Sequence, residues 1–263
     1  MTRDEIEAEF YDWECRQILG VQSQDVDLIV SLAREFGGPV LELGCGSGRI
    51  TVPLASSGIE VVAVDRNPWM LSNLRRKFES TVADVGARVQ VVETDICDFD
   101  LDAQFPFIIA PYNVLCYLLD PAQLRLCLRA VHRHLKPGGH FFCQVEPVQT
   151  TVRRRSTWEL LAVDFLQAQG GPVVALYERT RSDHSREIIS FDERYVVFCP
   201  DGTKQTHEYT LRMRSVHRSE IELLFELEGY RVIRAFAGLD LSSIEIDSAA
   251  TFIYISQRMD PKN

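Results

Sequence analysis

Apolar residues recur along the chain in short runs that alternate between strand-like and helical spacing. Runs rich in Val, Ile, Leu and Phe predict β-strands at residues 39–43, 60–65, 88–93, 105–112 and 140–147. Helical spacing predicts helices between them, at residues 49–57, 68–78 and 121–135. Short β-rich runs separated by helices indicate a parallel sheet with crossover helices.

Segments at both ends extend this alternation. Residues 25–36 have the spacing of an amphipathic helix, which the Gly-Gly-Pro sequence at 37–39 ends. After residue 216, a helix over 217–230 precedes two more strand-like runs, at 230–238 and 249–258. We expect these two strands to complete the main sheet.

Between about residues 172 and 215 the pattern changes. Strand-like runs at 172–181, 187–198 and 204–214 follow one another directly, and Pro200-Asp201-Gly202 forms a turn between the last two. Such a succession predicts an antiparallel meander and no further crossover unit.

The predicted fold is therefore α/β: a Rossmann-like, doubly wound, mostly parallel seven-stranded sheet with an inserted antiparallel β lid. Residues 1–147 are expected to form an N-terminal cover and the ligand-binding core. Residues 148–215 are expected to form the lid over a substrate, and residues 216–263 the helix and strands that complete the sheet.

Composition and charge narrow the classes of partner. The 263 residues can bury one sizeable core, and the net charge of −10 argues against a surface that follows nucleic-acid phosphates. No apolar run approaches the length of a membrane span, and the acidic opening TRDEIEAEF lacks the features of a secretory signal, so we expect a cytoplasmic protein. The seven cysteines show no C-x-x-C pair, which favours reduced thiols and no metal site.

A glycine-rich turn, LELGCGSG at residues 41–48, is the first motif that indicates a ligand site. Its three glycines follow a strand and precede a helix, so the backbone can turn tightly and a ligand can approach closely. The dinucleotide pattern G-x-G-x-x-G requires glycine at position 49, where Arg49 stands. The loop therefore suits a nucleotide-sized ligand other than NAD.

Two acidic residues stand where an adenosine ligand needs them. Asp65 ends the second strand at a spacing from Gly44 that suits hydrogen bonds to both ribose hydroxyls. Asp95 ends the third strand, where a carboxylate can accept from the adenine amino group while Ile96 offers an apolar edge. Either acid alone is equally consistent with a strand-end cap, but their placement at consecutive strand ends favours a ligand site.

These motifs, together with LKPGG ahead of an apolar strand, resemble in their order those of the class I S-adenosylmethionine-dependent methyltransferases over about residues 38–147. The segments AEFYDW, IAPYNVLCYLL and HRSEIELLFELEGYRV resemble the small-molecule branch, which includes sugar-amine and glycine-type N-methyltransferases. The resemblance implies an enzyme of the EC 2.1.1 class. It would move a methyl group from S-adenosyl-L-methionine to a nitrogen or oxygen of a small metabolite and leave S-adenosyl-L-homocysteine.

The resemblance also implies site residues. The cofactor site would comprise Tyr11, Glu42, Gly44, Cys45, Gly46, Gly48, Asp65, Arg66, Met70, Asp95, Ile96 and Pro111. Residues near predicted strand ends or in the N-terminal cover give the catalytic candidates Tyr11, Tyr117 and Glu146. The substrate candidates are Trp13, Tyr112, Asn113, Tyr117 and Glu146. For each of these candidates taken singly, packing or ordinary hydrogen bonding is the simpler role.

Several alternatives stay open. The amide-methylating signature Asn-Pro-Pro-Tyr is not matched by residues 109–112, IAPY, which removes the main support for nucleobase or glutamine methylation. A silent S-adenosylmethionine-binding or protein-interaction module fits an intact cofactor loop equally well, and so does a peptide or protein methyltransferase with an open groove. Arginines of the predicted lid suggest either a basic substrate surface or salt-bridged solvated faces, and the second is favoured. The methyl acceptor, the use of a base and a homodimer are left undecided.

Overall fold

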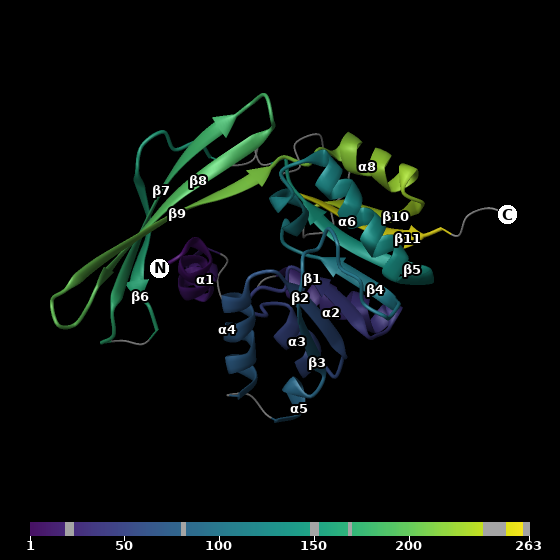
Figure 1. Ribbon diagram of the computed structural model, residues 1–263, viewed down its shortest axis with the longest axis horizontal. Helices are drawn as coiled ribbons and strands as arrows, with labels where there is room; N and C mark the ends of the chain where they lie inside the picture. Colours follow the sequence, from purple (N-terminus) through teal and green to yellow (C-terminus); the bar gives the residue numbers. More distant parts are fainter. Residues whose placement is uncertain (19–23, 80–82, 148–152, 168–169, 239–250, 260–263) are drawn as a thin grey trace.

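The computed structural model describes residues 1–18, 24–79, 83–147, 153–167, 170–238 and 251–259. Its strands form two separate sheets, one of seven strands and one of four. Figure 1 shows the four-stranded sheet projecting from one side of the seven-stranded core, with the N-terminal helix α1 (Arg3–Ile18) between the two.

The main sheet has the strand order β10-β11-β5-β4-β1-β2-β3. Its strands are β1 (Val40–Leu43), β2 (Val61–Asp65), β3 (Val89–Glu93), β4 (Phe105–Ala110), β5 (Leu135–Val145), β10 (Tyr230–Ala237) and β11 (Phe252–Arg258). Strands β1 to β5 pair in parallel, whereas β11 pairs antiparallel with both β5 and β10. This topology confirms the predicted mostly parallel, seven-stranded sheet.

Helices cover both faces of this sheet, as a doubly wound fold requires. The helices are α2 (Gln24–Phe36), α3 (Thr51–Ser56), α4 (Pro68–Glu79), α5 (Ala83–Gly86), α6 (Pro121–His134) and α8 (Arg218–Leu227), with a 3-10 turn η1 (Val114–Tyr117). Apolar residues of α2, α3 and α4 pack on one face and those of α6 and α8 on the other, so alternate strand residues serve two cores. None of the described helices is long and apolar enough to cross a membrane.

The second sheet is the predicted antiparallel meander with one strand more than the sequence pattern indicated. Its strands, in order, are β6 (Glu159–Phe165), β7 (Val173–Asp183), β8 (Ile188–Phe198) and β9 (Lys204–Arg214). Strand β6 is not among the predicted strands. This strand lies at the sheet edge and is only partly buried, so ELLAVDF lacks a clear alternation of apolar and polar positions.

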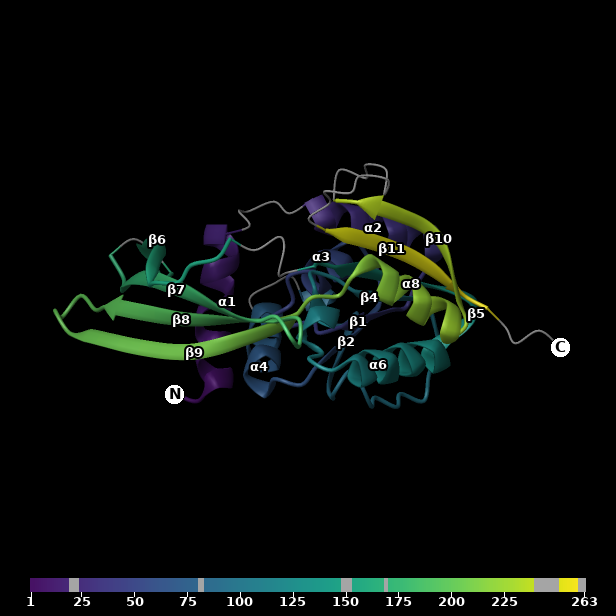
Figure 2. The same cartoon turned by 90° about the horizontal axis from the view of Figure 1, so that it is seen from above.

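Helix α1 docks through its apolar face on the sheet of β6 to β9, which we call the lid sheet. Phe10 stacks on Tyr195 of β8 with 4.2 Å between ring centroids, and Trp13 meets the same ring edge-on at 6.4 Å. Ile6, Phe10 and Trp13 share one buried cluster with Val174 of β7. Figure 2, turned by 90°, again shows α1 against the lid strands, so the helix and the lid form one packed unit.

Opposite the lid, α1 meets α4 through polar contacts. The side-chain amide of Asn73 donates to the backbone carbonyl of Ala8 at 2.7 Å, and Lys77 forms an ion pair of 2.8 Å with Asp12. Residues 8 and 12 are one helical turn apart, so this second face runs along the helix on the side away from the apolar one. Helix α1 is therefore held from two sides.

Element boundaries differ from the sequence prediction at a few places. Strand β5 begins at Leu135, before the Pro-Gly-Gly sequence expected to form a separate turn, because Leu135 already pairs with Phe105 of β4. Strand β4 ends at Ala110, two residues before the predicted end. The start of the predicted lid at residue 148 and the first two residues of the predicted strand 249–258 lie outside the described residues.

Replacement of Phe10 tests the docking of α1. Phe10→Ala removes a ring that is only 2 % exposed, together with its stacking contact to Tyr195. Large-to-small changes of this kind lower the free energy of unfolding by about 3–5 kcal/mol. We expect urea unfolding to show a loss of that size. Glu9→Ala, at an exposed position of the same helix, is the control and should change stability by less than about 0.5 kcal/mol. Equal stabilities of the two variants would contradict this account.

Candidate functional site

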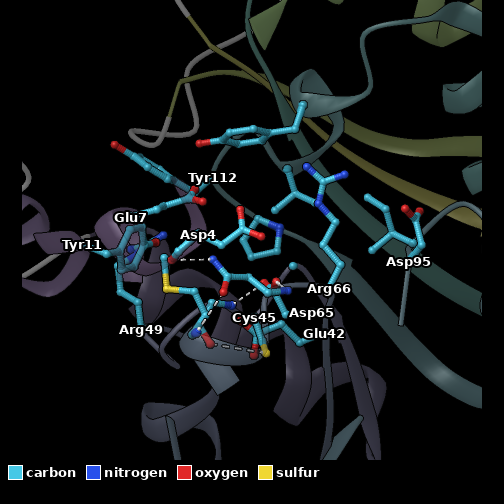
Figure 3. A pocket seen from close by; sticks show the side chains of 18 of the residues that line it. Asp4, Glu7, Tyr11, Glu42, Cys45, Arg49, Asp65, Arg66, Asp95 and Tyr112 are labelled. Carbon is cyan, nitrogen blue, oxygen red and sulfur yellow. Dashed lines mark hydrogen bonds between the residues drawn. The ribbon is translucent and has the colours of Figure 1, made fainter. Parts of the chain in front are cut away.

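A cavity of about 490 Å³ lies at the carboxyl ends of β1, β2, β3 and β4, beneath helix α1 (Figure 3). This volume lies within the range of small-molecule sites. Ligands of open α/β sheets bind outside the carboxyl ends of the strands, where the order of strands reverses. In this sheet the reversal falls between β1 and β4, so the topology and the cavity agree.

The glycine-rich turn forms the floor of the cavity. Gly46 has a φ of +54°, which residues with a side chain rarely adopt, and the Tyr11 ring lies 3.8 Å from where a Cβ would stand. Gly48 serves packing instead: a Cβ there would stand 2.3 Å from Leu74 Cδ1 of α4. The spacing of glycines therefore combines a ligand surface at Gly46 with close helix packing at Gly48.

Asp65 ties this turn to the next βα connection. Its Oδ2 accepts a hydrogen bond of 2.8 Å from the Gly46 backbone N–H, and its Oδ1 accepts one of 2.8 Å from the Asn67 N–H. Asn67 in turn accepts from the backbone N–H of Trp69 at the start of α4. Each carboxylate oxygen keeps a further lone pair, so Asp65 can accept additional hydrogen bonds from a ligand.

Glu42 contributes a buried acid from the middle of β1. Its side chain is 1 % exposed and accepts a hydrogen bond of 2.6 Å from the Thr51 hydroxyl of α3. Burial raises its pKa to about 8, although the Thr51 contact opposes the change. The carboxyl group is therefore largely protonated at neutral pH and can donate a hydrogen bond.

The wall formed by the β4 connection has unusual backbone geometry. Tyr112 and Asn113 have φ values of +47° and +62°, in the left-handed region that residues with a side chain rarely adopt. Such strain is typical of functional sites. The Arg49 guanidinium lies over the Tyr112 ring, 4.9 Å from its centroid, and pairs through both nitrogens with Asp25 of α2 at 3.0 and 2.6 Å.

Helix α1 forms the roof. Tyr11 and Glu7, one turn apart, line the cavity, together with Asp4 and Arg3 near the start of the helix. Burial is the main cause that raises the pKa of the Tyr11 phenol, so this group stays protonated and can donate to a ligand. The roof is consequently polar and mostly acidic.

The structure brings together most of the residues expected from the sequence. The cavity is lined by Tyr11, Glu42, Gly44, Cys45, Gly46, Asp65, Arg66, Met70, Asp95, Ile96, Pro111, Tyr112 and Tyr117. Four expected residues do not line it: Gly48, Trp13, Asn113 and Glu146. Trp13 packs on the lid, and the Glu146 carboxylate accepts a hydrogen bond of 2.8 Å from the Thr251 hydroxyl.

Sequence reasoning missed a second group of lining residues. These are Arg3, Asp4, Glu7, Arg49, Ile50, Asn67, Thr94, Val114 and Leu118. Most adjoin a residue that was expected, and Glu7 is one helical turn before Tyr11, so helical spacing could have found it. In the sequence, Arg49 marks only a departure from the dinucleotide pattern, because its contact with Tyr112 depends on tertiary structure.

Several arginines of the predicted lid form ion pairs with carboxylates. Arg179 and Arg181 both contact Asp192, at 2.9 and 2.6 Å, and Arg155 contacts Glu178 at 2.7 Å. For these three arginines the preferred interpretation, salt-bridged faces, is confirmed. Among the described residues, no cluster of His, Cys, Asp and Glu is arranged to hold a metal ion.

The buried acid of β1 predicts a pH-dependent difference in stability. Because folding raises the Glu42 pKa from 4.5 to about 8, its contribution is complete below pH 4.5 and declines until pH 8. Between pH 5 and pH 8, the free energy of unfolding of the wild type should therefore fall by on the order of 4 kcal/mol relative to that of Glu42→Gln. Urea unfolding of both proteins, measured across this pH range, tests the expected difference. Parallel pH curves would show that Glu42 does not titrate in this way.

Comparison with known proteins agrees with the site. Residues 40–139 match a protein family described as a methyltransferase domain. A carboxy-S-adenosyl-L-methionine synthase from Yersinia enterocolitica is 32% identical over 146 residues, which are 52% of this chain and 53% of the relative. The chain thus spans about half the length of the curated relatives it matches.

Solved structures share the fold across nearly the whole chain. The CcbJ methyltransferase from Streptomyces caelestis matches with a TM-score of 0.75 and 22% identity, covering 97% of this chain and 96% of the other. The sugar N-methyltransferase KedS8 from Streptoalloteichus sp ATCC 53650 matches with a TM-score of 0.73 and 18% identity, covering 95% and 93%. Residues 40–139 are thus a methyltransferase domain, and the fold around them is one that this chain shares with solved methyltransferases.

Proposed function

We propose that this protein transfers the methyl group of S-adenosyl-L-methionine to a nitrogen or oxygen atom of a small metabolite. The observation that carries the proposal is the roofed cavity, in which Asp65 and Gly46 form one hydrogen-bonded surface beneath Tyr11. A silent binding module needs only the floor of such a site. The roof encloses the ligand and so favours a reaction from which water is excluded.

The lining residues divide the cavity into two ends. Asp65 suits the ribose hydroxyls, and Asp95 with Ile96 suits the adenine, as the family resemblance implies. Gly46 and Tyr11 would then face the methionine part of the cofactor. Tyr112 and Tyr117, beyond the end of β4, are left for the acceptor.

Methyl transfer depends mainly on the positions of the acceptor atom and the methyl group. S-adenosylmethionine supplies a methyl group on a positively charged sulfur, and an acceptor atom must lie in line with it. A well-oriented pair of reactants can gain about 7–11 kcal/mol over the reaction in solution. Phenol rings such as Tyr11 and Tyr117 can stabilise positive charge through their faces, by about 0.5–2 kcal/mol.

An amine is favoured over an alcohol as the acceptor. Glu7 lines the cavity on the same helix face as Tyr11, and Asp4 lies beside it, so the roof attracts a cationic ammonium group. An alcohol gains nothing from these charges. KedS8, whose fold this chain shares, is a sugar N-methyltransferase, which supports the same class of acceptor.

The lid argues against a large peptide or protein acceptor. Its sheet packs through α1 against the core and forms one unit with the roof, whereas a protein substrate would need a broad open groove. We accordingly propose residues 148–215 as the substrate cover, with residues 1–147 and 216–263 as the core.

The assignment of Asp65 predicts a loss of cofactor affinity. Asp65→Asn replaces one charged acceptor oxygen by a donor, and loss of such hydrogen bonds costs about 1.5–3 kcal/mol. We expect S-adenosylmethionine to bind about ten- to a hundredfold more weakly in calorimetry. Asp98→Asn, at an exposed position outside the cavity, is the control. Equal affinities of the two variants would contradict the role of Asp65.

Turnover decides between the candidate functions. The protein is mixed with S-adenosylmethionine and matched pairs of small amines and alcohols, and S-adenosylhomocysteine is measured. We expect product with amines. Cofactor binding with no turnover on any small acceptor would favour a silent module, and turnover only on peptides would favour a peptide methyltransferase.

A further inference from the structure

Helix α1 is tied to the two strand-end connections that form the floor of the cavity. Asp4, Ala8 and Asp12 are spaced by four residues, so they lie in one stripe along the helix, on the side of α4 (Figures 1 and 2). The Asp4 carbonyl accepts a hydrogen bond of 3.2 Å from the side-chain amide of Asn67, and the Ala8 carbonyl accepts one of 2.7 Å from Asn73. The third residue of the stripe, Asp12, makes its contacts through its carboxylate.

The Asp12 carboxylate bonds to the glycine-rich turn itself. Its Oδ1 accepts a hydrogen bond of 2.5 Å from the Ser47 hydroxyl, and its Oδ2 lies 2.8 Å from Lys77 Nζ. Lys77 also donates to the Ser47 backbone carbonyl at 2.8 Å. We call these three side chains the latch. They join the roof, the turn and α4 at one point.

The latch lies directly beside the narrow part of the cavity. Asp12 follows Tyr11 in the chain, and Ser47 follows Gly46. Tyr11 and Gly46 both line the cavity, and the Tyr11 ring lies 3.8 Å from where a Gly46 Cβ would stand. A hydrogen bond between residues 12 and 47 therefore fixes the height of the Tyr11 ring above the turn.

Within the latch, the hydrogen bond matters more than the ion pair. Ser47 is fully buried, at 0 % exposure, whereas the side chains of Asp12 and Lys77 are 38 % and 35 % exposed. An ion pair between such exposed side chains contributes little. A carboxylate that accepts from a buried hydroxyl forms a strong, charge-assisted bond, and its removal takes a partner from a group that water does not reach.

The latch also reaches the floor through the backbone of the turn. Ser47 is next to Gly46, whose N–H donates to Asp65 at 2.8 Å. A ligand held by Asp65 and the turn therefore rests on the same short segment that holds the roof. Roof and floor are joined by a chain of contacts that crosses the turn in two residues.

We propose that Asp12 is a positioning residue of the roof, which through Ser47 holds Tyr11 over a cofactor bound on the glycine turn. This role rests on the proposed binding of S-adenosylmethionine in the cavity. The cofactor enters while the hydrogen bond between residues 12 and 47 is open, and the bond forms over it afterwards. The latch thereby slows the departure of S-adenosylmethionine, and of S-adenosylhomocysteine after the reaction, without slowing their entry.

The test measures how fast S-adenosylhomocysteine binds to and leaves the full chain, and it needs no acceptor. Asp12→Ala should raise the dissociation rate constant about tenfold, as expected for loss of one charge-assisted hydrogen bond, while the association rate constant stays within about twofold. Ser47→Ala removes the same bond from the other side and should have the same effect. The double variant should dissociate no faster than Asp12→Ala, because residues that share one bond are not additive.

Asn73→Ala is the matched control for a general loosening of the helix. It removes the hydrogen bond to the Ala8 carbonyl, on the same stripe of α1, and leaves the bond between Asp12 and the glycine turn in place. Both of its rate constants should stay within about twofold of the wild type. Urea unfolding of each variant shows that the proteins compared are folded, and Ser47→Ala replaces Asp12→Ala in the comparison if the latter does not fold.

Three results would overturn the proposal. The first is a latch variant that releases S-adenosylhomocysteine at the wild-type rate, and the second is an Asn73→Ala variant that releases it as fast as Asp12→Ala does. The third is a double variant in which the two single effects multiply. A wild-type protein that binds neither S-adenosylmethionine nor S-adenosylhomocysteine, in contrast, overturns the proposed function itself.

Discussion

The position of helix α1 between the lid sheet and the core is the constraint on which the site depends. Its apolar face is fixed by the stacking of Phe10 on Tyr195, and its polar face by Lys77 and Asn73 of α4. The remaining face is left for Glu7 and Tyr11, which line the cavity. A helix held from two sides can keep a polar face over a cavity, because packing on those two sides offsets the conformational entropy lost when the helix is ordered.

Beneath this roof, Asp65 organises the floor. Both of its oxygens accept backbone hydrogen bonds, from the glycine turn and from the start of the α4 connection. Strand β2 therefore fixes the turn after β1, and two neighbouring strand ends act as one rigid surface. A surface that is ordered before a ligand arrives loses little conformational entropy on binding, which favours affinity. The roof and the floor together explain why one cavity can hold a charged cofactor and an acceptor.

The sequence predicted the elements whose surroundings are uniform. Strand β4 is almost fully buried and shows as a continuous apolar run, and α2 shows a clear amphipathic pattern. Edge strand β6 was missed because its partly exposed residues have no regular alternation. Helix α1 was expected only as part of an N-terminal cover, because its surfaces meet an apolar sheet, a polar helix and a cavity. Three different neighbours leave no single apolar stripe in the sequence.

By itself, the sequence determined the fold class and most of the expected residues that line the cavity, because Asp65, Asp95 and the glycine turn follow strand ends in a fixed order. Local spacing is sufficient there, since consecutive parallel strands bring their carboxyl ends to the same edge. Only the tertiary structure decided the roof and the contacts of α1 with the lid. Glu14 and Tyr195 are 181 residues apart in the chain and meet only because α1 packs on the lid. Contacts between distant segments leave no periodic trace in one sequence, so these contacts depend on packing that the pattern does not encode.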